Sequence, residues 1–247
     1  MSALPASFAA AGGAPPPSHE VVRVGRDGGV RALVGTPWPG WSRGDEAGVY
    51  ATRLEPQALA ALADALAGLP GVGGPAPPDA GRFVLALADG RTLRWDPFAE
   101  VPAEVAAAAA SMRGVLEEAR RHPRAAVRLT LEERAGGLAF VFASTGTEPV
   151  TMRLTAPPRL RAVAAPGGSA SDPPPLAWVR EAMPLGADPP GPAELAPGER
   201  LTLEAPPPET AAGPHRLDGF ASVRLDIPGG DGALDAVLAA GPLVRRA

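Results

Sequence analysis

Histidine, the side chain most often used in metal binding and acid–base catalysis, occurs three times in this chain of 247 residues. His19 lies near the N-terminus, His122 directly precedes Pro123 after a helix-like stretch, and His215 precedes an alternating apolar run. No two of them have the i, i+4 spacing that turns both imidazoles of a helix toward one metal ion. The sequence therefore predicts surface or turn histidines and no metal site.

Nucleophilic side chains are equally scarce. The chain contains no Cys and no Lys, which removes thiol nucleophiles, disulfides and Schiff-base lysines. Ser144 lies in a predicted turn, and no Gly-x-Ser-x-Gly elbow is present to expose a reactive serine. Glu117-Glu118 and Glu132-Glu133 are adjacent pairs whose side chains point to different sides, so we expect solvated carboxylates and no acid–base dyad.

One glycine-rich stretch, Gly68-Leu-Pro-Gly-Val-Gly-Gly74, resembles a phosphate-binding loop. It follows a predicted helix, whereas nucleotide sites follow a strand, and no helix begins after it to offer its amides to a phosphate. We therefore expect a linker there. The sequence predicts no catalytic, cofactor-binding or metal-binding residue and no cofactor, and an enzyme is the least expected class of protein.

Candidate contacts for a partner lie in the segment Thr36-Pro-Trp-Pro-Gly-Trp-Ser-Arg-Gly-Asp45. Rigid aromatic side chains concentrate binding energy at interfaces, so Trp38 and Trp41, with Arg43 beside them, are the candidate residues for protein binding. The alternative is that both rings fold back onto a small core, which a chain with only 4% aromatic residues would need.

Composition limits the partners further. The 23 basic residues are all arginines, spread along the chain, and the net charge is −4, which argues against a nucleic-acid partner because phosphate binding needs a basic face. No apolar run reaches the length of a membrane span, and residues 1–10 lack the parts of a signal peptide. We expect a cytoplasmic protein without a membrane partner, unless a misassigned start hides a leader. The abundance of Ala, Gly, Pro and Arg is typical of a GC-rich bacterium.

The fold class predicted from the sequence is α+β followed by all-β. Residues 1–19, mostly Ala, Pro, Gly and Ser, are predicted to form a flexible arm. Residues 20–124 are predicted to form a small antiparallel sheet with two helices, and residues 125–247 an immunoglobulin-like β-sandwich module. Within the sandwich, the Pro- and Gly-rich insert 155–175 is expected to be mobile at least in part.

Short sequence patterns support these assignments. Leucines at helical spacing follow Pro56, a residue favoured at the first helical position, and a second helix is expected from about Pro102 to Arg121. Asp89-Gly90, a dipeptide favoured in two-residue turns, separates two alternating runs and predicts a hairpin. Beyond Pro123 the helical period disappears, and short alternating strands separated by turns follow.

The first module, about residues 20–123, resembles the emfourin-like inhibitors of thermolysin-type metalloproteases. The resemblance is one of layout. In order along the chain, the layout has a strand pair at a glycine turn (Gly28-Gly29) and a helix start (Leu54-Glu55-Pro56). A hairpin (Asp89-Gly90) and an acidic–proline segment before the last helix (Asp96-Pro97 through Pro102) follow.

The second module, about residues 126–246, is similar to the immunoglobulin-like sandwich of BsuPI-type intracellular proteinase inhibitors. The matching phrases are Ser144-Thr-Gly-Thr-Glu-Pro-Val150 and Leu195-Ala-Pro-Gly-Glu-Arg-Leu-Thr-Leu203. The two resemblances imply a non-catalytic protein-binding protein, with proteinase inhibition through loops of two rigid modules as its specific form. The alternative is a structural or assembly adaptor that binds another protein through the sandwich.

Overall fold

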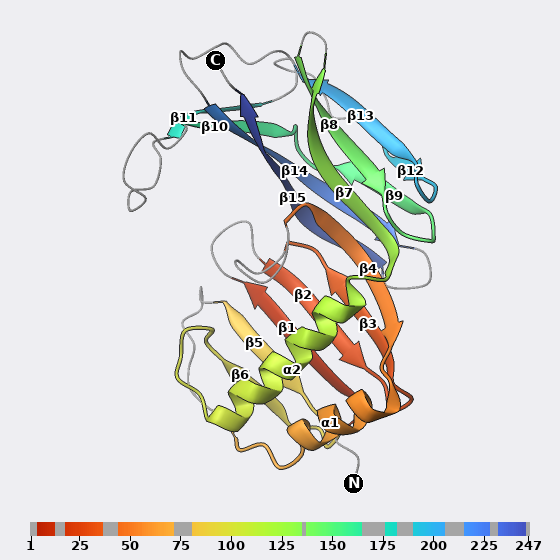
Figure 1. Cartoon of the computed structure of the whole chain (residues 1–247), viewed down its shortest axis with the longest axis vertical. Coiled ribbons are helices and arrows are strands. Elements are labelled where there is room, and N and C mark those ends of the chain that lie inside the picture. The colour runs from red at the N-terminus through yellow and green to blue at the C-terminus, as the bar shows by residue number, and fades with distance from the viewer. Residues whose placement is uncertain are drawn as a thin grey trace. The chain divides into compact units, whose positions relative to one another are not determined.

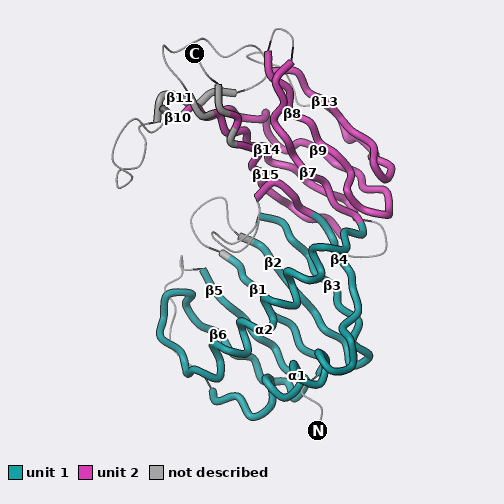
Figure 2. Tube along the Cα trace, in the orientation of Figure 1, with its two compact units in different colours: residues 1–43, 48–124 teal, residues 44–47, 125–247 magenta. Residues whose placement is uncertain are grey.

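The structure, a computed structural model, describes residues 4–12, 18–36, 44–71, 81–134, 137–164, 176–181, 190–205, 215–227 and 232–245. The chain forms two compact units, shown in different colours in Figure 2. Unit 1 comprises residues 1–43 and 48–124, and unit 2 comprises residues 44–47 and 125–247. Unit 2 therefore takes in a short piece from the first half of the chain, which the sequence did not indicate.

Unit 1 is built on an antiparallel sheet in which β4, β3, β2, β1, β5 and β6 lie side by side in that order (Figure 1). Every neighbouring pair in this order is antiparallel. The strands are β1 (Ala6–Gly12), β2 (Ser18–Val24), β3 (Gly29–Val34), β4 (Glu46–Arg53), β5 (Arg82–Ala86) and β6 (Thr92–Trp95).

The prediction of a flexible arm over residues 1–19 is wrong for β1. This strand lies inside the sheet, with Ala9 opposite Val21 of β2 and Val84 of β5. Phe8 is 1% exposed and Ala10 is fully buried. An alanine-rich run has little apolar area of its own, but a strand paired on both sides satisfies its backbone hydrogen bonds, and the ring of Phe8 adds most of the buried area.

Helix α2 (Ala103–Ala119) lies in front of this sheet in Figure 1, across one of its faces, and α1 (Pro56–Leu66) lies beside α2 at the lower ends of the strands. Both helices begin where the proline signals predicted. Helix α2 contacts β1, β2 and β3 as well as α1. Its buried side carries residues at helical spacing, namely Val105, Ala108, Ala109, Met112, Val115, Leu116 and Ala119. None of the helices in the described part of the chain has the length and apolar character needed to cross a bilayer.

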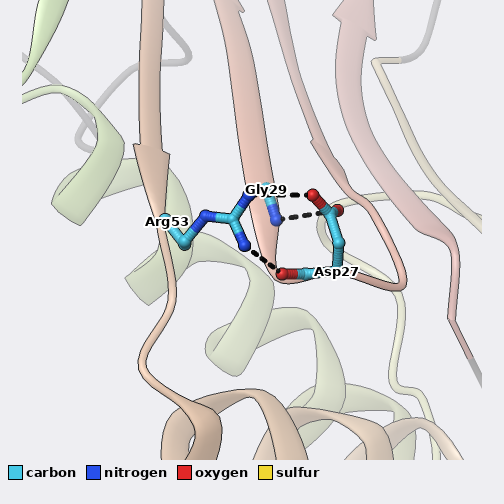
Figure 3. A network of polar contacts seen from close by, with 3 residues as sticks. All are labelled: Asp27, Gly29 and Arg53. Carbon is cyan, nitrogen blue, oxygen red and sulfur yellow. Dashed lines mark hydrogen bonds and ion pairs between the residues drawn. The ribbon is translucent and has the colours of Figure 1, made fainter.

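The β2–β3 and β5–β6 hairpins of unit 1 each turn at a glycine with positive φ, as their sequences predicted. Gly28 has φ 82° in the β2–β3 turn, and Gly90 has φ 87° in the β5–β6 turn. Figure 3 shows the first turn, where the main-chain N–H of Gly29 donates to the Asp27 carboxylate and Arg53 of β4 contacts the same residue. At the second turn, Arg91 donates a hydrogen bond to the carbonyl of Leu69, which follows α1.

The regular elements of unit 2 are all β-strands in its described residues, and these strands pair antiparallel. In one sheet, β8 (Gly137–Ser144) lies between β7 (Pro123–Arg134) and β13 (Arg200–Ala205). The order in the other sheet is β11 (Leu176–Glu181), β10 (Arg159–Ala164), β14 (His215–Ile227), β9 (Val150–Leu154) and β12 (Ala193–Leu195), and β15 (Gly232–Arg245) pairs with β14.

The two sheets of unit 2 touch through their inner side chains. A Cβ added at Gly219 of β14 would lie 2.9 Å from Cε1 of Phe140 in β8, and Phe140 is 1% exposed. A side chain larger than hydrogen therefore has no room at this crossing. The prediction of a strand-only second module is confirmed for the described residues; its immunoglobulin-like topology stays a prediction.

Candidate functional site

The residues predicted to contact a partner, Trp38, Trp41 and Arg43, lie outside the described residues. The insert 155–175 is described only up to Ala164, and β10 occupies its second quarter, so this part is a paired strand of the sheet. Other candidate contact residues lie in the described parts of the chain.

Immediately after the undescribed segment 37–43, a charged cluster is formed in unit 2. Arg128 of β7 places Nη2 2.5 Å from Oε2 of Glu46 and Nε 3.9 Å from Oδ2 of Asp45. The main chain of Asp45 accepts a hydrogen bond from the Leu129 N–H at 2.7 Å. These contacts hold Asp45 and Glu46 against β7.

A different loop of unit 1 presents an aromatic side chain to solvent. Phe98, in the segment that joins β6 to α2, is 91% exposed, and it is the one large hydrophobic side chain that stands out as exposed in the described ranges. Its exposure was not predicted from the sequence. The available signal was an aromatic residue directly after Asp96-Pro97, outside any apolar period.

The loop that carries Phe98 is held at both ends. The Phe98 N–H donates to Oδ1 of Asp96 at 2.8 Å, and the Ala99 N–H donates to the Asp96 carbonyl at 3.0 Å. At the far end, the Pro102 carbonyl accepts the first hydrogen bonds of α2, from Val105 and Ala106, both at 3.0 Å. An aspartate-braced turn of this kind restricts the backbone before any partner binds.

Trp95, three residues earlier, shows the opposite behaviour. Its indole is 8% exposed and packs with two phenylalanines under the helices, with centroid distances of 5.8 Å to Phe83 and 6.2 Å to Phe8. Strand β6 is thereby fixed in the core while the loop that follows it points an aromatic ring outward. Phe98 therefore projects from a loop that directly follows a strand fixed in the core.

The serine and glutamate side chains considered as candidate catalytic groups are either buried or held in ion pairs. The Ser144 hydroxyl is buried and forms no hydrogen bond within the described ranges, whereas an activated serine needs a base within hydrogen-bond distance. Glu118 pairs with Arg121 and His122, at 2.9 and 3.5 Å, on an exposed helix end. Glu132 pairs with Arg134 at 2.7 Å. These carboxylates belong to surface ion pairs.

The histidines are dispersed. His19 is exposed on β2 and His122 is exposed at the end of α2. His215 opens β14, opposite Arg245 of β15. Within the described segments, no three histidine, aspartate or glutamate side chains gather closely enough to hold a metal ion.

Besides Glu46, two further buried carboxylates are each paired with an arginine. In unit 1, Oε1 of Glu20 lies 3.7 Å from Nη1 of Arg120, whose guanidinium stands 5.7 Å from the centroid of the Tyr50 ring. In unit 2, Asp218 accepts two hydrogen bonds from Arg161, at 2.7 and 3.3 Å. Such pairs fix the relative positions of strands and helix ends, because removing one partner leaves a charge in a low-dielectric interior.

No model of a known protein family matches the chain, and no curated protein matches it.

Proposed function

We propose that this chain is a non-catalytic protein-binding protein that acts as a proteinase inhibitor, with Phe98 as a principal contact. The observation that carries the proposal is a nearly fully exposed phenylalanine on a loop braced by Asp96 and anchored by the buried Trp95. An aromatic ring presented in a restricted conformation loses little entropy on binding and fills an apolar pocket of a partner. The layouts that resemble emfourin-like and BsuPI-type inhibitors support the choice of a protease as that partner, with the second module as an immunoglobulin-like sandwich.

Progress curves with one thermolysin-like and one subtilisin-like protease test this proposal. We expect stoichiometric inhibition of one of them, and a Phe98→Ala variant with at least about tenfold weaker inhibition, since truncation of a hot-spot residue costs about 2 kcal/mol or more and tenfold corresponds to about 1.4 kcal/mol. Phe98→Tyr, which keeps the ring, is the matched control. Unchanged inhibition by Phe98→Ala would remove this loop from the mechanism, and no inhibition of either protease would remove the inhibitor function.

An adaptor that binds through unit 2 is the second candidate, and the edge of β13 favours it. In the described sheet β13 pairs with β8 alone, so its other edge can accept a strand from a partner. A photo-reactive phenylalanine analogue placed at position 202 of β13 or at position 98 separates the two candidates. Crosslinking to a partner from position 202 alone supports the adaptor, and crosslinking to a protease from position 98 alone supports the inhibitor.

A further inference from the structure

Strand β13 of unit 2 lies at the margin of its sheet, beside β8 (Figure 1). In the described part of the chain, β8 is the one strand that pairs with it. The side chains at alternate positions, Arg200, Thr202 and Glu204, are exposed, and Leu201 and Leu203 between them are partly exposed. Solvent therefore reaches both faces of this strand from Arg200 to Glu204.

The hydrogen bonds next to β13 show which of its main-chain groups point outward. At the end of β8, the Ser144 N–H donates to the carbonyl of Glu199, which directly precedes β13, at 2.9 Å. Facing residues in an antiparallel ladder exchange hydrogen bonds at every second position, so Leu201 and Leu203 bond to β8. The residues between them direct their main-chain N–H and C=O groups away from β8; these residues are Arg200, Thr202 and Glu204. Such an edge is a template for another strand.

The leucines of β13 carry the apolar side of the sheet to this edge. Leu203 lies opposite Phe140, whose ring meets the other sheet of unit 2 at Gly219. Leu201, two residues before it, shares this face. Phe140 is buried, whereas both leucines are partly exposed. A strand with apolar residues at two alternate positions would cover them.

The sequence of β13 from Arg200 to Glu204 is complementary to itself in the antiparallel direction. When Thr202 lies opposite Thr202 of a second copy, each Arg200 faces Glu204 of the other copy. This register also pairs all the outward-pointing N–H and C=O groups and places each leucine opposite a leucine. Opposite charges and threonine pairs at facing positions stabilise antiparallel strands. A parallel pairing in the same register would instead bring like charges together.

The two charges of this edge are weakly engaged within their own chain. Nη1 of Arg200 lies 3.9 Å from Oε1 of Glu132, and the Arg200 side chain is 66% exposed. Glu132 has a closer cation in Arg134, at 2.7 Å. Glu204 lies opposite Ala139 on β8 and forms no ion pair within the described ranges. Both charges can therefore pair with those of a second strand.

We propose that β13 binds β13 of a second copy of this chain, antiparallel and centred on Thr202, in a twofold-symmetric dimer. Such an interface uses the same residues on both subunits. Charges on edge strands commonly prevent pairing, but the charges on β13 permit one direction and one register. This edge is small against the roughly 1,200–2,000 Å² of a stable interface, so we expect a weak dimer with a Kd of roughly 10–100 µM. The dimer does not require inhibition of a protease, and it occupies the edge that an adaptor would offer to another protein.

Sedimentation velocity of the full chain, from about 1 µM to about 500 µM, tests the dimer with charge variants. Arg200→Glu places a carboxylate opposite Glu204 of the second copy, and Glu204→Arg places a guanidinium opposite Arg200. Each single variant repels itself at two positions, but a one-to-one mixture of them restores both opposite-charge pairs. The double variant Arg200→Glu with Glu204→Arg restores them within one chain. Arg121→Glu, at an exposed arginine of unit 1, is the matched control for net charge.

We expect the unchanged chain to dimerise in this range and each single variant to dimerise at least about tenfold more weakly. The mixture and the double variant should regain the original Kd within about threefold, and Arg121→Glu and Phe98→Ala should stay within about twofold of it. Because Phe98→Ala weakens inhibition and not dimerisation, failure of one proposal is distinguishable from failure of the other. A monomer throughout the range, single variants that dimerise normally, or a mixture that stays monomeric would each overturn the proposal.

Thr202→Pro tests the main-chain part of the interface. Proline is tolerated on an edge strand where its missing N–H would face solvent, so the pairing with β8 should persist. We expect this variant to lose the dimer while its urea midpoint changes little. A dimer of unchanged strength would overturn the register centred on Thr202.

Discussion

Arg53 of β4 binds Asp27 in the β2–β3 turn twice, with Nη1 2.9 Å from the main-chain carbonyl and Nη2 3.0 Å from the carboxylate (Figure 3). The carboxylate also accepts the Gly29 N–H at 3.1 Å. This last hydrogen bond is the main reason why the pKa of Asp27 is lowered; desolvation opposes it, and the charge of Arg53 lowers the pKa further. One aspartate thus closes its own turn and ties it to a third strand.

Asp27→Asn should make unit 1 less stable at neutral pH and less sensitive to acid. Because the folded-state pKa of Asp27 is lowered, its stabilisation is complete above the unfolded-state pKa, near 3.9, and is lost as the pH falls through the folded-state value. Urea unfolding of the two proteins from pH 7 down to about pH 2 measures this. The curves of unfolding free energy against pH should converge in acid; parallel curves would contradict the assignment.

Gly28→Ala should cost more stability than Gly90→Ala. Both glycines have positive φ, so both substitutions carry the left-handed backbone cost of about 1–2 kcal/mol. A Cβ at Gly28 would also lie 3.1 Å from the Leu54 carbonyl oxygen, whereas a Cβ at Gly90 has nothing within 4 Å. Urea midpoints of the two variants give the comparison. Equal losses would show that the backbone near Leu54 yields freely.

The elements of unit 1 that were predicted correctly begin or turn at residues with strong backbone preferences of their own. Pro56 fixes the start of α1, and Asp89-Gly90 fixes the β5–β6 turn, because both depend on backbone preferences of the residues themselves. Strand β1 has no such signal. Its alanines become a strand only because β2 and β5 pair with it on either side, and β5 is about seventy residues away.

The candidate surfaces were harder to predict for the same reason. Alternation within β13 shows that Leu201 and Leu203 share a face, but the position of this strand at the edge of its sheet follows from the order β7-β8-β13. Likewise, the exposure of Phe98 follows from the packing of its neighbour Trp95, not from its own type. The prediction for Trp38, Trp41 and Arg43 stays a prediction, because these residues lie outside the described ranges.

Gly219→Ala should destabilise unit 2 through Phe140. The new methyl group would meet Cε1 of a buried ring at 2.9 Å, and overpacking of a core typically costs about 1–3 kcal/mol. Phe140→Leu removes the clashing ring edge, so the double variant should lose less stability than the sum of the two single variants, with a coupling of about 0.5–3 kcal/mol. Strict additivity in urea unfolding would mean that the two sheets do not meet at this point.

Arg120→Leu should destabilise unit 1 far more than Arg121→Leu, although the residues are neighbours at the end of α2. Arg120 is 10% exposed and faces Glu20, which is 1% exposed, so its removal takes a cation away from a buried carboxylate, at a cost of about 3–5 kcal/mol. Arg121 is 74% exposed beside Glu118, and such surface pairs contribute about 0–1 kcal/mol.

Adding Glu20→Leu to Arg120→Leu should restore much of the lost stability, because the carboxylate that made the first change costly is then absent and the site becomes apolar. Thermal and urea unfolding of the two single variants and the double variant measure this. A double variant less stable than Arg120→Leu alone would show that Glu20 stabilises the junction of β2 with α2 through contacts other than Arg120.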